Sequence, residues 1–154
     1  MLTEASRVLR PGGLILLGEW VHPPVDSSTG TSPPGVTAFC QAFDNSLLSL
    51  YAIPNIPPYL TESISQLGGF VDIQSRDYNM PIGDWAWSSP GAKALGVKFR
   101  KTLEIWAESA ATVLARAGYD EDVVQGLLDG FTREISSTAG LQLAYRVVTA
   151  HRAA

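Results

Sequence analysis

The chain has 154 residues, of which 45% are hydrophobic and 17% are charged, and its formal net charge is −4. This length predicts a single domain with its own core, and the composition excludes a largely disordered chain. The 11 basic residues are scattered along the sequence. Phosphate binding requires clustered Lys and Arg, so we expect no nucleic-acid partner.

The chain has one cysteine, Cys40, which excludes an internal disulfide and fits a reducing compartment. Cys40 lies within an apolar helical pattern, so we interpret it as a buried thiol rather than a nucleophile. The apolar run from Leu14 to Leu17 is too short to span a membrane, and it lacks the pattern of a signal peptide. We therefore expect a cytoplasmic protein.

The first third of the chain predicts a helix, a strand and a long loop. Residues 2–9 place apolar side chains on one helical face, and the Pro-Gly-Gly sequence at 11–13 ends that helix. Residues 13–21 form a strand whose run LILL is apolar on both faces, as in interior strands. Residues 22–36, rich in Pro, Gly and Ser, predict a loop that is either a linker or, as we favour, a pocket lid.

The remaining elements alternate helices with two further strands. Helical spacing covers 36–52, and the segment YLTESISQLGGF contains a short helix that leads into a strand at 69–78. A loop at 81–91 precedes a pair of helices at 93–136, and we expect Asp120 to cap the second helix of this pair. The last strand is 143–152. The fold class is therefore α/β, with a small three-stranded mixed sheet flanked by helices.

The segments RVLRPGGLILLGEW, LGGFVDIQSRDYNMPIGDW and YRVVTAHR occur in this order along the chain. They resemble the fifth, sixth and seventh strands of a class I methyltransferase that uses S-adenosylmethionine. The segment FRKTLEIWAESAATVLARAGYDEDVVQGLLDGFTREI is similar to the insertion in LaeA-like fungal methyltransferases of secondary metabolism. The resemblance implies a Rossmann-like fold in which residues 143–152 form the middle strand of the sheet.

The same family holds its methyl donor on its first strands, through a glycine-rich turn that follows a strand. Here the Gly-Gly pairs at 12–13 and 68–69 both precede strands, so the resemblance implies that the donor-binding half is absent. We expect no cofactor for the isolated chain, and S-adenosylmethionine only if a partner completes the fold. The strand at 13–21 would lie at a sheet edge, so we expect it to pair with a second copy or with another chain.

Candidate site residues lie where strands end, because ligands in open α/β sheets bind there. We predict catalytic roles for His22, Glu19 and Asp44, with His22 as the acid or base because histidine changes charge near neutral pH. Aromatic and polar residues around them would bind a small apolar substrate, namely Trp20, Asn45, Tyr51, Tyr78, Trp85 and Trp87. No His/Cys spacing predicts a metal site.

Three functions remain open from the sequence. The first is a truncated methyltransferase-like protein whose pocket binds a secondary metabolite or promotes its cyclisation or isomerisation without a cofactor. The second is a methyltransferase half that is active only with a partner chain that supplies the donor site. The third is a non-catalytic interaction module or a fragment from an incomplete gene model.

Overall fold

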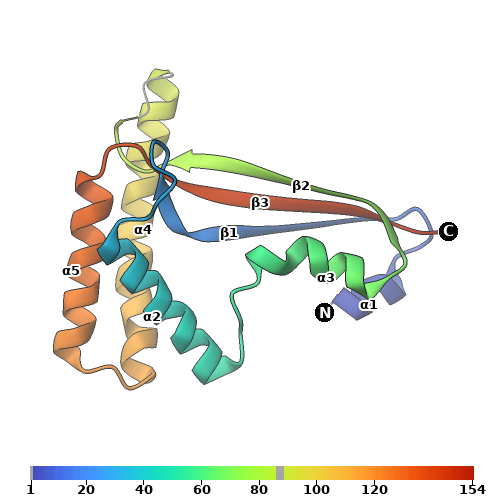
Figure 1. The fold of residues 1–154 in the computed structure, drawn as a ribbon, viewed down its shortest axis with the longest axis horizontal. Coiled ribbons are helices and arrows are strands. Elements are labelled where there is room, and N and C mark those ends of the chain that lie inside the picture. Colours follow the sequence, from blue (N-terminus) through green and yellow to red (C-terminus); the bar gives the residue numbers. More distant parts are fainter. Residues whose placement is uncertain (1, 86–88) are drawn as a thin grey trace. The chain divides into compact units, whose positions relative to one another are not determined.

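The computed structural model describes residues 2–85 and 89–154 (Figure 1). Its elements, in chain order, are α1 (Leu2–Val8), β1 (Leu14–Asp26), α2 (Pro34–Tyr51), the 3-10 helix η1 (Pro57–Tyr59), α3 (Leu60–Leu67), β2 (Phe70–Pro81), α4 (Pro90–Arg116), α5 (Glu121–Ser137) and β3 (Leu141–Arg152). The fold class is α/β, as the sequence predicts.

The three strands form one sheet in the order β1-β3-β2, so the last strand lies in the middle as expected. The start of β1 meets the end of β3, where the Gly12 N–H donates to the Arg152 carbonyl at 2.8 Å. The start of β2 also meets the end of β3, where the Ala153 N–H donates to the Gly69 carbonyl at 2.9 Å. Both outer strands therefore run antiparallel to β3, and each pairing in the sheet is antiparallel.

β1 extends further than the sequence predicts. It continues past Val21 through His22, Pro23 and Pro24 to Asp26, so the predicted loop at 22–36 is shorter. Proline lacks the N–H that a central strand must donate on both sides, but an edge strand pairs on one side only. The edge position of β1 thus explains how two prolines fit within it.

The chain divides into two compact units, which we describe one at a time. The first unit comprises Met1–Val21, Ile56–Tyr78 and Ala144–Ala154, and the second comprises His22–Asn55 and Asn79–Leu143. Each strand contributes residues to both units. That the chain forms a single domain stays a prediction.

In the first unit, α1 and α3 pack on alternate residues of the strands. Its buried residues are Ile15, Leu60, Ile64, Val148 and Ala150. Leu14 and Leu16 point away from this core and are 54% and 61% exposed. The run LILL is therefore buried on one face only, which corrects the expectation of two buried faces, because strand side chains alternate between the faces of a sheet.

A bidentate ion pair joins the two strands β2 and β3 within the first unit. Nε and one terminal nitrogen of Arg146 each donate to a carboxylate oxygen of Asp77 at 2.7 Å. This contact holds the pKa of Asp77 below its usual value, because the guanidinium hydrogen bonds favour the ionised carboxylate. Arg146 also donates to the Pro57 carbonyl of η1 at 3.3 Å, so this side chain of β3 contacts two other elements.

The second unit has a core of α2, α4 and α5, which lie against one another in Figure 1. Four aromatic rings, from Phe39, Phe43, Trp106 and Phe131, pack with centroid distances of 4.8–5.8 Å. Cys40 is buried beside them, and burial raises the pKa of its thiol to about 12. The thiol therefore stays protonated at neutral pH, which confirms the prediction that Cys40 is an inert core residue.

The N-terminus of α2 is held by α5. Pro33 precedes α2 and supplies no side-chain cap. Instead, the Val36 N–H donates to Oε2 of Glu134 at 2.9 Å, which places a carboxylate at the positive end of the helix dipole. The backbones cross closely here, because a Cβ on Gly35 would lie 2.9 Å from the Gly130 carbonyl carbon and oxygen.

The caps of the other long helices differ from expectation at one point. Asp120 precedes α5 with an extended backbone, but its side chain makes no capping hydrogen bond, so the predicted cap is wrong. At α4, the Ser89 hydroxyl accepts from the Ala92 N–H at 3.1 Å. None of the helices within the described residues combines the length and apolar character needed to cross a lipid bilayer.

We predict opposite effects for two Gly→Ala changes in these helices. Gly35→Ala should lower the free energy of unfolding by about 1–3 kcal/mol, because the added methyl group collides with α5 backbone. Gly126→Ala, in α5, has open space around the added methyl group and should raise it by about 0.5–1 kcal/mol. Urea denaturation measures both free energies of unfolding. If Gly35→Ala is as stable as Gly126→Ala, the close approach of the α2 and α5 backbones at Gly35 is contradicted.

Candidate functional site

The structure brings together two of the three predicted catalytic residues. His22 lies in the part of β1 that belongs to the second unit, and Asp44 lies midway along α2. Nδ1 of His22 is 3.5 Å from Oδ2 of Asp44. That distance is too long for a strong hydrogen bond but places opposite charges in contact when His22 is protonated.

Both members of this pair are largely shielded from solvent. The side chain of His22 is 21% exposed and that of Asp44 is 22% exposed. Nδ1 of His22 is fully buried and has no hydrogen-bond partner among the described residues. The exposed part of the imidazole ring therefore lies on atoms other than Nδ1.

Asn55 is the third member of this cluster, and the sequence analysis missed it. Its Nδ2 donates to Oδ2 of Asp44 at 2.9 Å. Its Oδ1 is buried and has no hydrogen-bond partner among the residues that the structure describes. The only signal in the sequence is an asparagine in the loop segment IPNIPP, which is typical of turns and does not indicate a contact eleven residues away.

Burial dominates the electrostatics of Asp44. It raises the pKa of the Asp44 carboxyl above its usual value, because a shielded carboxylate loses hydration. The charge of His22 and the hydrogen bond from Asn55 both act in the opposite direction and favour the ionised carboxylate. In this cluster, the imidazole of His22 and the amide of Asn55 therefore both lie within contact distance of one carboxylate oxygen, Oδ2 of Asp44.

Three of the remaining predicted residues belong to the first unit, which is described by itself. Glu19 is exposed on β1. The ring of Trp20 packs against Tyr145 with 4.8 Å between centroids. Arg76 lies over the ring of Tyr78 at 5.1 Å from its centroid. Their predicted roles in catalysis or binding stay predictions.

In the second unit, Asn45 and Tyr51 are exposed on α2. Asn45 follows Asp44 directly, but successive helical residues project in directions about 100° apart. Tyr51 ends the helix and is 50% exposed. Trp87 lies outside the described residues.

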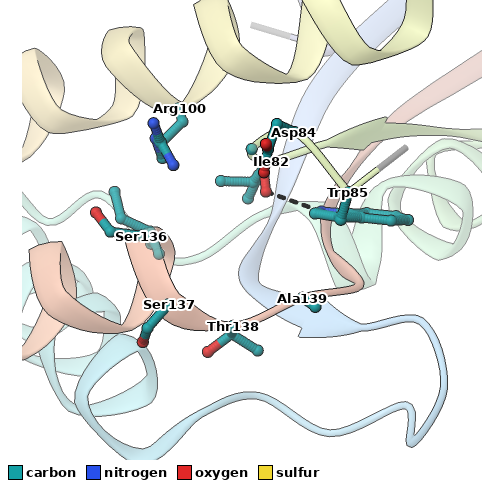
Figure 2. Close-up of a pocket in the computed structure, with 10 residues that line it drawn as sticks. Ile82, Asp84, Trp85, Arg100, Ser136, Ser137, Thr138 and Ala139 are labelled. Atoms are coloured by element: carbon teal, nitrogen blue, oxygen red, sulfur yellow. Dashed lines mark hydrogen bonds between the residues drawn. The ribbon is translucent and has the colours of Figure 1, made fainter. Parts of the chain in front are cut away.

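Trp85 has a structural role in the second unit. Its indole N–H donates to the carbonyls of Ile82 at 2.8 Å and Leu141 at 2.9 Å, which joins the end of β2 to the start of β3. It also lines a small open cavity with Asp84, Arg100 and the last turn of α5, as Figure 2 shows.

This cavity differs from the aromatic pocket that the sequence predicts. Its volume is about 100 Å³, whereas pockets for drug-sized ligands span roughly 300–1,000 Å³. Trp85 is the predicted binding residue that lines it, and Nε of Arg100 lies 3.7 Å from Glu104 on the next turn of α4. Within residues 2–85 and 89–154, no group of three His, Cys, Asp or Glu residues is placed to hold a metal ion.

A comparison with solved structures gives a weak likeness. No protein-family model matches the chain. No curated protein matches it either. The chain is similar to a solved structure of Haemonchus contortus phosphoethanolamine N-methyltransferase 2 in complex with phosphomonomethylethanolamine and S-adenosylhomocysteine, with 18% identity and a TM-score of 0.43. The match covers 99% of this chain but 29% of that protein. Its sequence identity and TM-score are too low to assign a family.

The raised pKa of Asp44 predicts how stability changes with pH. The folded state holds the Asp44 proton more tightly than the unfolded state, so this group stabilises the fold below its unfolded pKa of about 3.9. That stabilisation is lost as the pH rises through the folded pKa. Asparagine does not ionise, so the free energy of unfolding of Asp44→Asn should lack this decrease. It should therefore rise relative to that of the wild type as the pH rises from about 3 to about 6.

Urea denaturation across that pH range measures the difference. Asp129→Asn, a change at an exposed acid on α5, is the matched control and should follow the pH profile of the wild type. A stability difference for Asp44→Asn that shrinks with rising pH would show that Asp44 is stabilised in its charged form instead.

Proposed function

We propose that His22 and Asp44 form an acid–base pair that acts on a small apolar metabolite without a cofactor. The observation that supports this is the 3.5 Å approach of His22 Nδ1 to Asp44 Oδ2 in a largely shielded setting. A carboxylate on one side of an imidazole stabilises the protonated ring that forms when its other nitrogen takes a proton. Such a pair suits reactions in which one proton leaves an atom of the substrate and returns to another.

Isomerisation and cyclisation are two reactions of this kind. His22 would remove a proton from a carbon or oxygen of the metabolite, and the resulting imidazolium would return that proton after the bonding electrons have shifted. No atom is gained or lost, so no oxidant or group donor is required. Shielding from water strengthens the interactions of the charges that form on the way.

The proposed substrate class draws on apolar side chains that follow Asp44 in the sequence. The C-terminal half of α2 and the residue after its cap expose apolar side chains, with Leu48 at 54%, Tyr51 at 50% and Ile53 at 46%. These residues follow Asp44 in the same unit and favour an apolar ligand over a charged one. Binding roles for Trp20, Asn45, Tyr78, Trp85 and Trp87, a role for Glu19, and a cytoplasmic location belong to the same proposal.

A nitrobenzisoxazole probes this proposal without the natural substrate. Its ring opens to a coloured cyanophenolate once a base removes one carbon-bound proton, so the reaction reports a base in apolar surroundings. Wild type should exceed the rate of free imidazole at equal concentration, and His22→Gln should lower it by about 10²-fold or more.

The chain provides a matched control for this measurement. His151 is the second of its two histidines, lies in the first unit and is exposed, so His151→Gln should retain the rate of the wild type. An unchanged rate in His22→Gln, or a wild-type rate no higher than that of imidazole, would remove His22 from the proposal.

A second candidate function is a methyltransferase half that a partner chain completes. It draws on the resemblance in the sequence, and the edge position of β1 supports it. One side of β1 pairs with β3, and Leu14 and Leu16 are more than half exposed in the first unit. An open, apolar strand edge pairs readily with another strand, either of a second copy or of a chain that brings the donor-binding strands.

Sedimentation and calorimetry test this second candidate together. The purified chain is titrated with S-adenosylmethionine and S-adenosylhomocysteine after its oligomeric state has been measured by ultracentrifugation. Saturable binding by a homo-oligomer would favour the methyltransferase function. A folded, monodisperse chain that binds neither compound would eliminate a donor site in the chain alone and favour the acid–base pair.

A further inference from the structure

We propose that Asn55 is a positioning residue, which holds Asp44 so that neutral His22 carries its proton on Nδ1 and offers Nε2 as the base. This inference rests on the proposed acid–base function. The inference states which ring nitrogen of His22 acts as the base and which residue selects it. The approach of His22 to Asp44 alone does not decide this.

One oxygen atom of Asp44 is shared by both neighbours. Nδ2 of Asn55 lies 2.9 Å from Oδ2, and Nδ1 of His22 lies 3.5 Å from the same Oδ2. An amide NH₂ group only donates, so Oδ2 must act as an acceptor toward Asn55. The Asn55 hydrogen bond thereby restricts rotation of the carboxylate and keeps Oδ2 turned toward His22.

The proton on His22 follows from this arrangement. A lone pair on Nδ1 would face a carboxylate oxygen at close range, which is repulsive, whereas an Nδ1–H group is attracted to it. Nδ1 is also buried and has no hydrogen-bond partner among the described residues, so nothing there competes with Asp44. Neutral His22 is therefore expected to be protonated on Nδ1, which leaves the lone pair on Nε2. The Nδ1 to Oδ2 contact would shorten when a substrate arrives, as catalytic hydrogen bonds commonly do.

The end of α2 is built to return Asn55 to Asp44. Ala52 adopts a left-handed conformation with φ of 53°, and its N–H donates to the Leu48 carbonyl at 3.0 Å. The N–H of Ile53 donates to the Leu47 carbonyl at 3.3 Å, which closes the cap. A left-handed conformation is unfavourable for a residue with a side chain, so this turn is held by its surroundings.

Burial of Asn55 fits a positioning role better than a surface turn. The residue is partly buried, and its Oδ1 has no hydrogen-bond partner among residues 2–85 and 89–154. A loop asparagine on the surface would instead turn both amide atoms to water. The amide is thus committed to Asp44 at the expense of its own carbonyl oxygen.

Nitrogen NMR of the imidazole rings tests the inference directly. In ¹⁵N-labelled wild type above the titration of His22, Nδ1 should show the shift of a protonated nitrogen and Nε2 that of an unprotonated one. Asn55→Leu removes the donor at nearly constant volume and should convert His22 to a mixture of both forms. Its turnover of the nitrobenzisoxazole should fall by roughly tenfold to a hundredfold through kcat, with KM little changed.

Asn79→Leu is the matched control, because Asn79 is an exposed asparagine on β2 in the second unit and has no proposed role. It should leave both the tautomer and the turnover of the wild type. If Asn55→Leu does not fold, Asn55→Ala removes the same donor and is measured in the same way.

Two results would overturn the inference. One is a wild-type His22 protonated on Nε2, and the other is a folded Asn55 variant that keeps the wild-type tautomer. Both are independent of turnover, so they separate this inference from the proposed function. If His22 carries its proton on Nδ1 in the wild type but His22→Gln keeps the wild-type turnover, the inference is supported and the proposed function is wrong.

Discussion

The crossing of α2 and α5 at Gly35 and Gly130 decides where the candidate site lies within the second unit. The two backbones approach closely there because Gly35 carries no side chain, whose Cβ would lie 2.9 Å from the Gly130 carbonyl. The carboxylate of Glu134 then reaches the Val36 N–H and replaces the cap that Pro33 does not provide. Since α2 carries Asp44, a shift of this helix would move the carboxylate away from His22. The core residues of α2, α4 and α5 hold the same alignment along the rest of its length.

The Asp44 cluster shows a conflict between stability and chemistry. Burial raises the pKa of the carboxyl, while His22 and Asn55 restore part of the preference for the charged form. Two buried atoms, Nδ1 of His22 and Oδ1 of Asn55, have no hydrogen-bond partner among the described residues. Buried polar atoms without hydrogen-bond partners are uncommon in proteins, and unfavourable local arrangements of this kind are often found at functional sites. Asp77 in the first unit is the contrast, because each of its carboxylate oxygens accepts a hydrogen bond from Arg146, which lowers its pKa.

In the first unit, one face of the sheet is covered by helices and the other carries exposed leucines. Ile15 and Val148 face α1 and α3, whereas Leu14 and Leu16 point to the opposite face of the sheet and are exposed. Because side chains alternate along a strand, covering one face of β1 leaves Leu14 and Leu16 on the other face. The edge position of β1 also leaves one row of its backbone groups without a neighbouring strand in the described sheet. The exposed leucines and the open edge belong to the same strand, which is why we treat β1 as the place where another chain could add.

The sequence by itself determined the elements and their type. Hydrophobic periodicities of 3.6 and 2 residues, together with Pro and Gly at element ends, predict all three strands and the major helices, although β1 ends later than predicted. The largest difference is at 22–36, where Pro, Gly and Ser predict a loop but β1 continues to Asp26. Proline fits a strand that has a neighbour on one side only, and the sequence does not show which strand lies at an edge. His22 and Asp44 could be singled out because their side chains suit acid–base chemistry, and His22 also directly follows the predicted strand 13–21.

Only the tertiary structure decided which of those side chains meet. Nothing local distinguishes Asp44 from Asn45, since both are polar residues on one helix, and the orientation of α2 depends on a glycine contact with residues almost a hundred positions later. Asn55 was invisible for the same reason, because its partner lies across a helix cap that turns the chain back. Contacts of this kind arise from packing between distant segments, whereas periodicity records only which face of a single element is apolar.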